Sequence, residues 1–216
     1  YLASYVLTNL HIPGVTTYHT MMEEYVHYIP FMEPILRVYI RAQDRRFCDK
    51  HRAVIAPSIK IKKLLLSYGV SSHIEVIPNG VDLTPFKRSF SREEKRAFRK
   101  KYKIKEDDKV LIFVGRLGEE KSIDKLIENF ARVSEALPDS HLLLVGDGPL
   151  KGKLQELARS LRVGEKVHFT GFLRWPDEIS LAYKSSDAFM IASHTETFGL
   201  VTLEAMASGL PVVAYK

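Results

Sequence analysis

The chain has 216 residues, of which 45% are hydrophobic and 27% are charged, as in ordinary globular proteins. Its one cysteine, Cys48, excludes an intramolecular disulfide and a cysteine-rich metal site, and it fits a reducing cytoplasm. No apolar run approaches the roughly 20 residues that a membrane-spanning helix needs. The chain starts at Tyr1 and stops at Lys216, directly after an apolar run, so we expect truncation at both ends.

Positive charge is concentrated in two stretches. The net charge is +6, with nine Lys or Arg residues in 37–63 and ten in 87–105. Such clusters suit phosphate-bearing ligands or an anionic membrane surface, and they are equally common as plain solvated surface. We do not expect nucleic acid as a partner, because there is no zinc-finger spacing, helix-turn-helix pattern or aromatic-basic motif.

From residue 109 onward, short apolar runs alternate with segments of helical periodicity. The expected strands are 110–114, 141–145, 167–169, 188–192 and 211–215. The expected helices are 123–137, with Ser122 as N-cap, then 154–161, 179–185 and 199–208. This alternation predicts a parallel sheet covered on both faces. Ligands bind such sheets beyond the carboxyl ends of the strands.

The first part of the chain has the same character. We expect the end of a helix in 1–10, strands at 14–18, 53–56 and 74–77, and helices at 32–50 and 59–68. Residues 83–108 are charged and read as a linker with an exposed helix. The sequence therefore predicts three parts: the end of one α/β domain in 1–82, a connection in 83–108, and a second, incomplete α/β domain in 109–216.

The most informative motif is ETFGLVTLE at residues 196–204, with two glutamates eight residues apart. A helix that begins near Gly199 directs its first amides toward the crevice, where the helix dipole favours a phosphate. These amides belong to Gly199, Leu200 and Val201. Glu204 lies among small apolar residues and needs hydrogen-bond partners such as ribose hydroxyls. The alternative is that Glu204 pairs with a lysine and Glu196 is a surface charge.

A second motif, VGRLGEEK at residues 114–121, places a glycine turn and two cations after a strand. Gly115 allows the backbone to approach a ligand closely. Arg116 can form a fork on a diphosphate, and Lys121 adds a point charge. Surface Arg and Lys in such a loop are also common without any ligand.

These motifs occur in one order with GDGP at 146–149, GFL at 171–173 and GLPVVA at 209–214. Together they resemble the donor domain of glycosyltransferase family 4, retaining enzymes with the GT-B fold of two Rossmann-like domains. The resemblance covers essentially the whole chain, and both domains would be incomplete here. It implies a hexosyltransferase with a UDP-, GDP- or ADP-sugar donor, for which UDP-glucose is our first choice.

The resemblance assigns roles to individual residues. Arg116 and Lys121 would hold the diphosphate, and Glu204 would hold the ribose. Glu196, Phe198 and Gly199 would line the sugar site. The backbone near Phe172 and Leu173 would contact the base. His19, at the end of a strand, would face the donor sugar, unless it is a structural histidine that bonds to the backbone.

The run YHTMMEEYVHYI at residues 18–29 looks like that of bacterial enzymes that glucosylate diacylglycerol. We therefore expect a lipid acceptor and a peripheral position on the inner face of the membrane, with the basic stretch 37–63 on anionic lipid. The aromatic and methionine side chains of this run are otherwise helix-packing residues. Two further readings remain: a soluble sugar or polysaccharide-precursor acceptor, and a non-catalytic nucleotide-sugar-binding fragment.

No Asp-x-Asp pair occurs in the chain, so we expect no metal and no other cofactor. Arg116 and Lys121 would neutralise the diphosphate instead. No side chain is a secure nucleophile, which favours front-face attack with retention. A complete two-domain enzyme needs about 150–200 residues in each domain. We therefore expect this chain alone to bind nucleotide weakly or to be inactive, and full turnover by it would contradict that expectation.

Overall fold

The computed structural model describes residues 9, 10, 12–28, 30–193 and 195–215. The chain forms two compact units. The first unit comprises Tyr1–Gly80 with Thr195–Phe198, and the second comprises Val81–His194 with Gly199–Lys216. Among the described residues, no helix is both long and apolar enough to cross a membrane. The helix end expected in 1–10 falls mainly on residues outside the described part.

The first unit contains a parallel sheet in the order β1-β2-β3. Its strands are β1 (Val15–Thr17), β2 (Ala53–Ala56) and β3 (His73–Val76). Its helices are the 3₁₀ helices η1 (Met22–Tyr28) and η2 (Pro30–Met32), then α2 (Glu33–Asp49) and α3 (Ile59–Ser67). The βα pattern expected from the sequence is therefore confirmed for residues 14–77, with bounds shifted by a residue or two.

The core of this unit lies between the sheet and helices α2 and α3. Val54 of β2, Cys48 of α2 and Ile61 of α3 are all fully buried in one cluster. Met21 is also buried there, so at this position the packing interpretation of the 18–29 run holds. Tyr18 donates a hydrogen bond of 2.6 Å to Asp44, whose pKa is raised by burial.

The second unit contains a parallel sheet in the order β6-β5-β4-β7-β8. Its strands are β4 (Lys109–Val114), β5 (Ser140–Val145), β6 (Val167–Gly171), β7 (Ala188–Ile191) and β8 (Val212–Ala214). Its later helices are α6 (Ile123–Ala136), α7 (Lys151–Ser160), α8 (Asp177–Lys184) and α9 (Leu200–Ala207). Each strand and helix expected after residue 109 is present.

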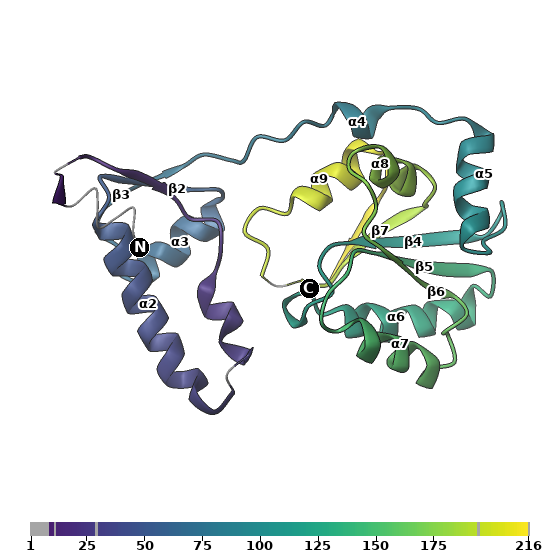
Figure 1. Ribbon diagram of the computed structural model, residues 1–216, viewed down its shortest axis with the longest axis horizontal. Helices are drawn as coiled ribbons and strands as arrows, with labels where there is room; N and C mark the ends of the chain where they lie inside the picture. The colour runs from purple at the N-terminus through teal and green to yellow at the C-terminus, as the bar shows by residue number, and fades with distance from the viewer. Residues whose placement is uncertain (1–8, 11, 29, 194, 216) are drawn as a thin grey trace. The chain divides into compact units, whose positions relative to one another are not determined.

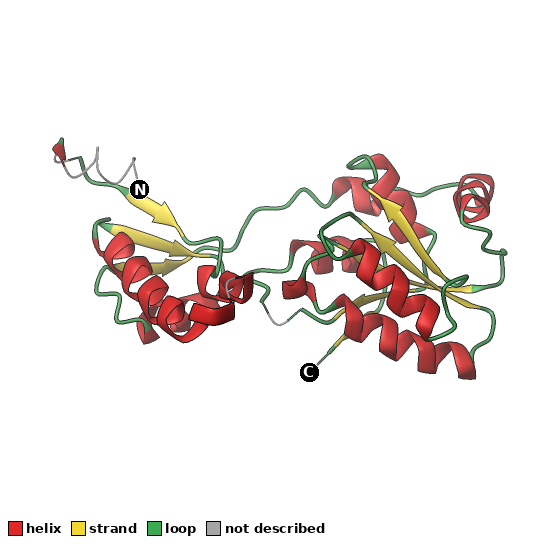
Figure 2. Ribbon diagram, turned by 60° about the horizontal axis from the view of Figure 1, so that its bottom comes forward, coloured by secondary structure: helices red, strands yellow, loops and turns green. Residues whose placement is uncertain are grey.

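Helices cover both faces of this sheet (Figures 1 and 2). Phe113 packs with α6 and α7, whereas its neighbours Ile112 and Val114 pack with α8 and α9. Successive strand residues point to opposite faces, so both faces must be apolar for the strand to be buried. Burial of both faces of the sheet therefore explains why the strands appear in the sequence as continuous apolar runs.

Residues 83–108 contain the exposed charged helix that the sequence predicted, but they are part of the second unit and not a linker between the two units. They form the short helix α4 (Thr84–Lys87) and helix α5 (Arg92–Lys101), and both belong to the second unit. Phe86, Phe98 and Ile104 are buried in its core beside α8. Arg99 donates hydrogen bonds to the carbonyl oxygens of Ser185 and Asp108 at 2.9 Å each. The sequence did not indicate this packing, because the three buried apolar residues lie among many charged ones.

Phe98→Ala tests whether this helix belongs to the core. Removing a buried phenylalanine costs about 3–5 kcal/mol of stability. We therefore expect the urea midpoint of the chain to fall strongly in Phe98→Ala and to stay almost unchanged in the control Lys100→Ala, which lies exposed on the same helix. Equal midpoints for the two variants would show that α5 is an accessory segment.

Candidate functional site

The site is built around the carboxyl ends of the strands in the second unit. All five strands run parallel, so the segments that follow them emerge at one edge of the sheet. β4 pairs with β5 on one side and with β7 on the other. After β4 the chain continues into α6 on one face of the sheet, and after β7 it continues into α9 on the other face. In α/β sheets, ligands bind at the point between two such neighbouring strands, which is called the topological switch point.

Three glycine loops at this edge are joined by backbone hydrogen bonds. The amide of Gly115 donates to Val145 at 2.9 Å, and the amide of Gly146 donates to Gly171 at 2.9 Å. Gly146 has a φ of +128°, and a Cβ atom there would lie 2.0 Å from the carbonyl oxygen of Gly115. No other residue fits that approach, so the edge is rigid and closely packed.

Arg116 and Lys121 follow β4 at this edge. Arg116 is exposed, and among the described residues it takes part in no ion pair. Lys121 ends the 3₁₀ turn η3 (Glu119–Lys121), and Ser122 then adopts the left-handed conformation before α6. Ser122 thus occupies the predicted cap position, although its side chain makes no capping hydrogen bond.

A side chain at the end of β7 holds the two halves of the switch point together. The Ser193 hydroxyl donates a hydrogen bond of 3.1 Å to the carbonyl oxygen of Glu120. This bond links the segment after β7 to the turn that carries Lys121. Ser193 was not predicted as a site residue, because a lone serine after a strand belongs to no motif.

Helix α9 begins where the ETFGLVTLE motif predicted. Gly199 is its N-cap with φ of +79°, a conformation that favours glycine. The amides of Leu200 and Val201 lie in the first turn, where no intrahelical acceptor is available to them. The positive end of the helix dipole adds to these donors, so the start of α9 favours an anion.

Glu204 is half-buried one turn further along α9. Tyr183 of α8 donates hydrogen bonds to the Glu204 carboxylate and to the carbonyl oxygen of Val201, each at 3.2 Å. Burial raises the pKa of Glu204, while the Tyr183 hydrogen bond acts in the opposite direction. The partner of Glu204 is therefore a buried tyrosine and not the lysine considered as an alternative.

Phe172 and Leu173 follow β6 at the same edge. The side chain of Phe172 is highly exposed, whereas Leu173 packs against the core. An exposed aromatic ring next to an anion-favouring edge suits a planar base, because aromatic faces stack well on bases. The predicted base-contact segment therefore lies on the same edge as the two cations and Glu204.

The remaining predicted residues belong to the first unit. His19 is exposed two residues after the end of β1, and no hydrogen bond of its ring occurs among the described residues. Glu196 and Phe198 lie in Thr195–Phe198, which is grouped with this unit. Within the unit, Lys60 Nζ donates to the carbonyl oxygen of Glu196 at 3.2 Å. The roles assigned to these three residues stay predictions.

A half-buried histidine pair lies at the opposite, amino edge of the second sheet. His141 contacts His168 at 3.0 Å and Asp108 at 3.0 Å. Burial, with a contribution from His141, lowers the pKa of His168 to about 4. In the part of the chain that the structure describes, no cluster of three or more His, Cys, Asp or Glu residues suits a metal ion. This pair is far from the anion-favouring edge along each strand.

Curated relatives match almost the whole chain. An alpha-monoglucosyldiacylglycerol synthase of Streptococcus pneumoniae is 37% identical over 215 residues, covering 99% of this chain and 48% of the relative. An enzyme of the same name from Acholeplasma laidlawii is 32% identical over 208 residues, with 94% and 52% covered. A sulfoquinovosyl transferase of Arabidopsis thaliana is 36% identical, with 95% and 38% covered. The chain thus spans about half the length, or less, of these relatives.

Solved structures show the same fold. Anabaena HepE in complex with UDP and glucose superposes with a TM-score of 0.79 at 23% identity, covering 99% of this chain and 55% of that one. Sucrose-phosphate synthase from Thermosynechococcus elongatus gives a TM-score of 0.75 at 23% identity, with 99% and 53% covered. At this identity the likeness establishes the GT-B fold alone.

Two family models divide the chain between them. The model described as "Glycosyltransferase Family 4" matches residues 1–85. The model described as "Glycosyl transferases group 1" matches residues 94–216, which is more than half of the chain. The chain belongs to the group 1 glycosyl transferases, and the resemblance inferred from its motifs is confirmed.

Proposed function

We propose that the protein is a retaining glycosyltransferase that moves glucose from UDP-glucose to a membrane lipid such as diacylglycerol. The second unit would bind the donor, and the first would contribute to the acceptor side. The names of the relatives from Streptococcus pneumoniae and Acholeplasma laidlawii support glucose and diacylglycerol. A solved neighbour with the same fold was crystallised with UDP-glucose, which supports the donor.

The observation that carries this proposal is the combination of groups at one edge of the second sheet. Arg116 and Lys121 follow β4, and the first turn of α9 follows the adjacent strand β7. Cations and unbonded helix amides suit a diphosphate. Glu204, in the same helix, offers a carboxylate that can accept hydrogen bonds from a ribose diol. A nucleoside diphosphate presents both chemical features.

The same groups suit the chemical step. Cleavage of the bond between the sugar and the diphosphate places negative charge on the departing UDP. Fixed positive groups stabilise such charge most effectively when they are positioned in advance. We propose that Arg116 and Lys121 supply this stabilisation without a metal or other cofactor. Glu196 and His19 would act on the sugar, as the family resemblance implies.

The acceptor assignment implies a position at a membrane. Diacylglycerol is confined to the bilayer, so the enzyme must work at its surface. We propose peripheral binding at the inner face of the cell membrane, where anionic lipids attract Lys and Arg at about 1 kcal/mol each. The basic stretch 37–63 belongs to the first unit, which is the acceptor side in this proposal.

Arg116→Ala tests the donor site. We expect UDP to bind the chain weakly but measurably in calorimetry. Loss of one charge-assisted contact costs about 1.5–3 kcal/mol, which is roughly a 10- to 100-fold weaker Kd. The control is Arg132→Ala, which removes an exposed arginine of α6. Equal UDP affinities in the two variants would contradict the diphosphate role.

Tyr183→Phe tests the ribose contact through its pH dependence. Glu204 must be ionised to accept two hydroxyl hydrogen bonds, so UDP affinity should fall as the pH drops through its raised pKa. The Tyr183 hydrogen bond keeps that pKa from rising further. Tyr183→Phe should therefore move the affinity midpoint to higher pH, while the control Tyr102→Phe leaves it in place. A Glu204→Gln variant that retains the native pH dependence would refute the assignment.

A further inference from the structure

Helix α2 exposes an apolar face in its first half. Ile35, Val38 and Tyr39 are 67%, 69% and 58% exposed, and their spacing places them on one side of the helix. The opposite side carries Asp44 and Cys48, which are buried. Single exposed hydrophobic residues are normal, but a group of large ones on one helix face marks an interaction site.

The segment before α2 extends this apolar group. Phe31 and Met32 of η2 are 99% and 49% exposed. Together with Ile35, Val38 and Tyr39, they form what we call the apolar half of the α2 face. Large hydrophobic side chains therefore face away from the core over the first half of α2 and the segment before it.

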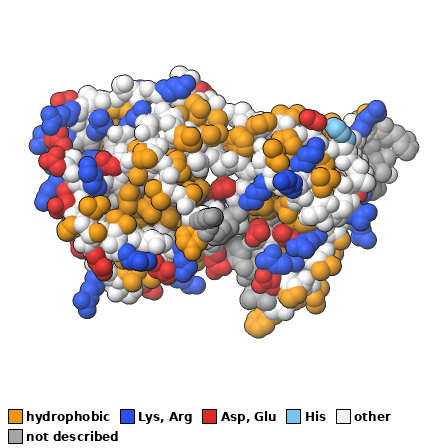
Figure 3. All heavy atoms as spheres, turned by 180° about the vertical axis from the view of Figure 1, so that it is seen from behind, with side chains coloured by type: hydrophobic (Ala, Val, Ile, Leu, Met, Phe, Trp, Pro, Cys, Tyr) orange, Lys and Arg blue, Asp and Glu red, His pale blue; other side chains and the backbone are white. Residues whose placement is uncertain are grey.

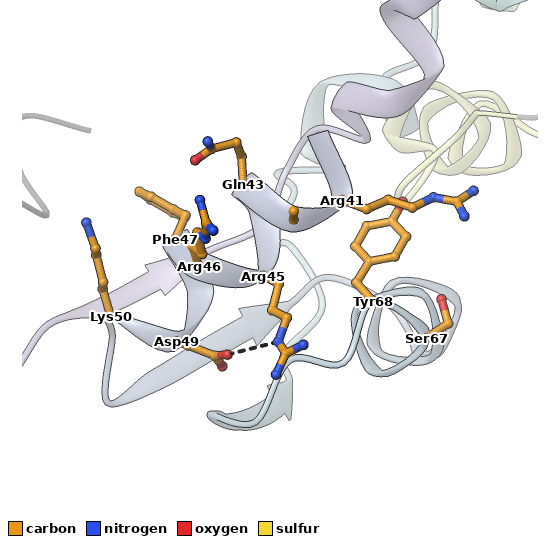
Figure 4. A pocket seen from close by; sticks show the side chains of 10 residues that line it. Arg41, Gln43, Arg45, Arg46, Phe47, Asp49, Lys50, Ser67 and Tyr68 are labelled. Carbon is orange, nitrogen blue, oxygen red and sulfur yellow. Dashed lines mark ion pairs between the residues drawn. The ribbon is translucent and has the colours of Figure 1, made fainter. Parts of the chain in front are cut away.

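The second half of the same face is basic. Arg46 and Lys50 are exposed and follow Tyr39 at helical spacing, on the side of α2 away from α3 (Figure 4). Toward α3, Arg45 pairs with Asp49 at 3.6 Å. A hollow of about 900 Å³ lies beside this half, and Arg41, Arg45, Arg46 and Lys50 line it against one acid, Asp49. We call Arg46 and Lys50 the basic half of the α2 face.

We propose that the α2 face docks on a lipid bilayer with anionic headgroups, the apolar half entering the interface and the basic half contacting phosphates. This inference rests on the proposed lipid acceptor and names the surface that would bring the enzyme to it. Helices that lie in the interface combine an exposed apolar side with Lys and Arg at its border. Aromatic side chains such as Phe31 and Tyr39 suit the headgroup level.

Charge favours a bilayer over a second copy of the chain. A symmetric dimer through α2 would place the basic half of one face against either the basic or the apolar half of the other. Both arrangements leave Arg46 and Lys50 without anions. An anionic headgroup layer satisfies both halves at once. Lys and Arg side chains are also scattered over the rest of the surface that Figure 3 shows, so a matched control is needed.

The test is co-sedimentation of the chain with vesicles of phosphatidylcholine alone or with 30% phosphatidylglycerol, roughly the anionic content that gives a substantial surface potential. Arg46→Gln with Lys50→Gln removes the basic half. The matched control is Lys100→Gln with Lys101→Gln, two exposed lysines of α5. Each cation near an anionic surface contributes about fivefold in partitioning, so we expect a loss of about 25-fold in the α2 variant. The control should lose less than threefold.

A second variant tests the apolar half of the α2 face. Its readout is a change in tryptophan fluorescence, so it does not rely on a loss of vesicle binding. Val38→Trp in a Trp175→Phe background places the single tryptophan on the α2 face. We expect its fluorescence to shift to shorter wavelength with anionic vesicles and to stay unchanged with phosphatidylcholine alone. Unchanged emission with both vesicle types would overturn the proposal, as would equal losses of binding in the α2 and α5 variants.

Two further readouts separate the alternatives. The first readout is the oligomeric state in solution. If the native chain is a dimer and the double variant Ile35→Ser with Val38→Ser is a monomer, the α2 face binds a second copy of the chain instead of a bilayer. UDP titration of the same proteins tests the donor site independently. Loss of vesicle binding with unchanged UDP affinity supports the docking surface. Intact vesicle binding with no UDP affinity in the native chain contradicts the proposed donor function and not the surface.

Discussion

The site depends on the position of β4 between two parallel neighbours. β4 pairs with β5 and with β7, and the chain leaves the two central strands toward opposite faces. This topology opens the edge of the sheet at one point, where the turn with Lys121 and the residues directly after β7 emerge side by side. The Ser193–Glu120 hydrogen bond fixes that opening. The pairing of β4 with β7 thus places the two cations and the start of α9 at the same edge of the sheet.

A second layer of contacts determines the chemistry of this edge. Tyr183 is fully buried on α8, and it holds both the Glu204 carboxylate and the Val201 carbonyl. Phe86 packs edge-to-face on the Tyr183 ring, with centroids 5.9 Å apart. The stretch 83–108, which we expected to be a linker with an exposed helix, therefore supports the residue that orients Glu204. A charged segment outside the motifs contributes to the site through packing alone.

The sequence predicted the parts of the molecule that depend on local chemistry. Continuous apolar runs gave the parallel strands, and the start of α9 at a left-handed glycine was predicted from Gly199. The family resemblance was confirmed by the comparisons. The partner of Glu204 was not predictable, because Tyr183 is a distant helix residue with no motif around it. The buried role of Phe98 was hidden by eight charged neighbours in its own helix. Contacts between segments far apart in sequence leave no periodic signal.

The most direct test of the account is hydrogen exchange of the chain with and without saturating UDP. If the switch-point edge binds the nucleotide, amides in 115–121 and 199–204 should exchange more slowly with UDP, because they are the donors and the turns that contact it. Amides of α2 and α5 should be unaffected. Protection confined to α5, or no protection at 115–121 and 199–204 under conditions where calorimetry shows binding, would contradict the central claim.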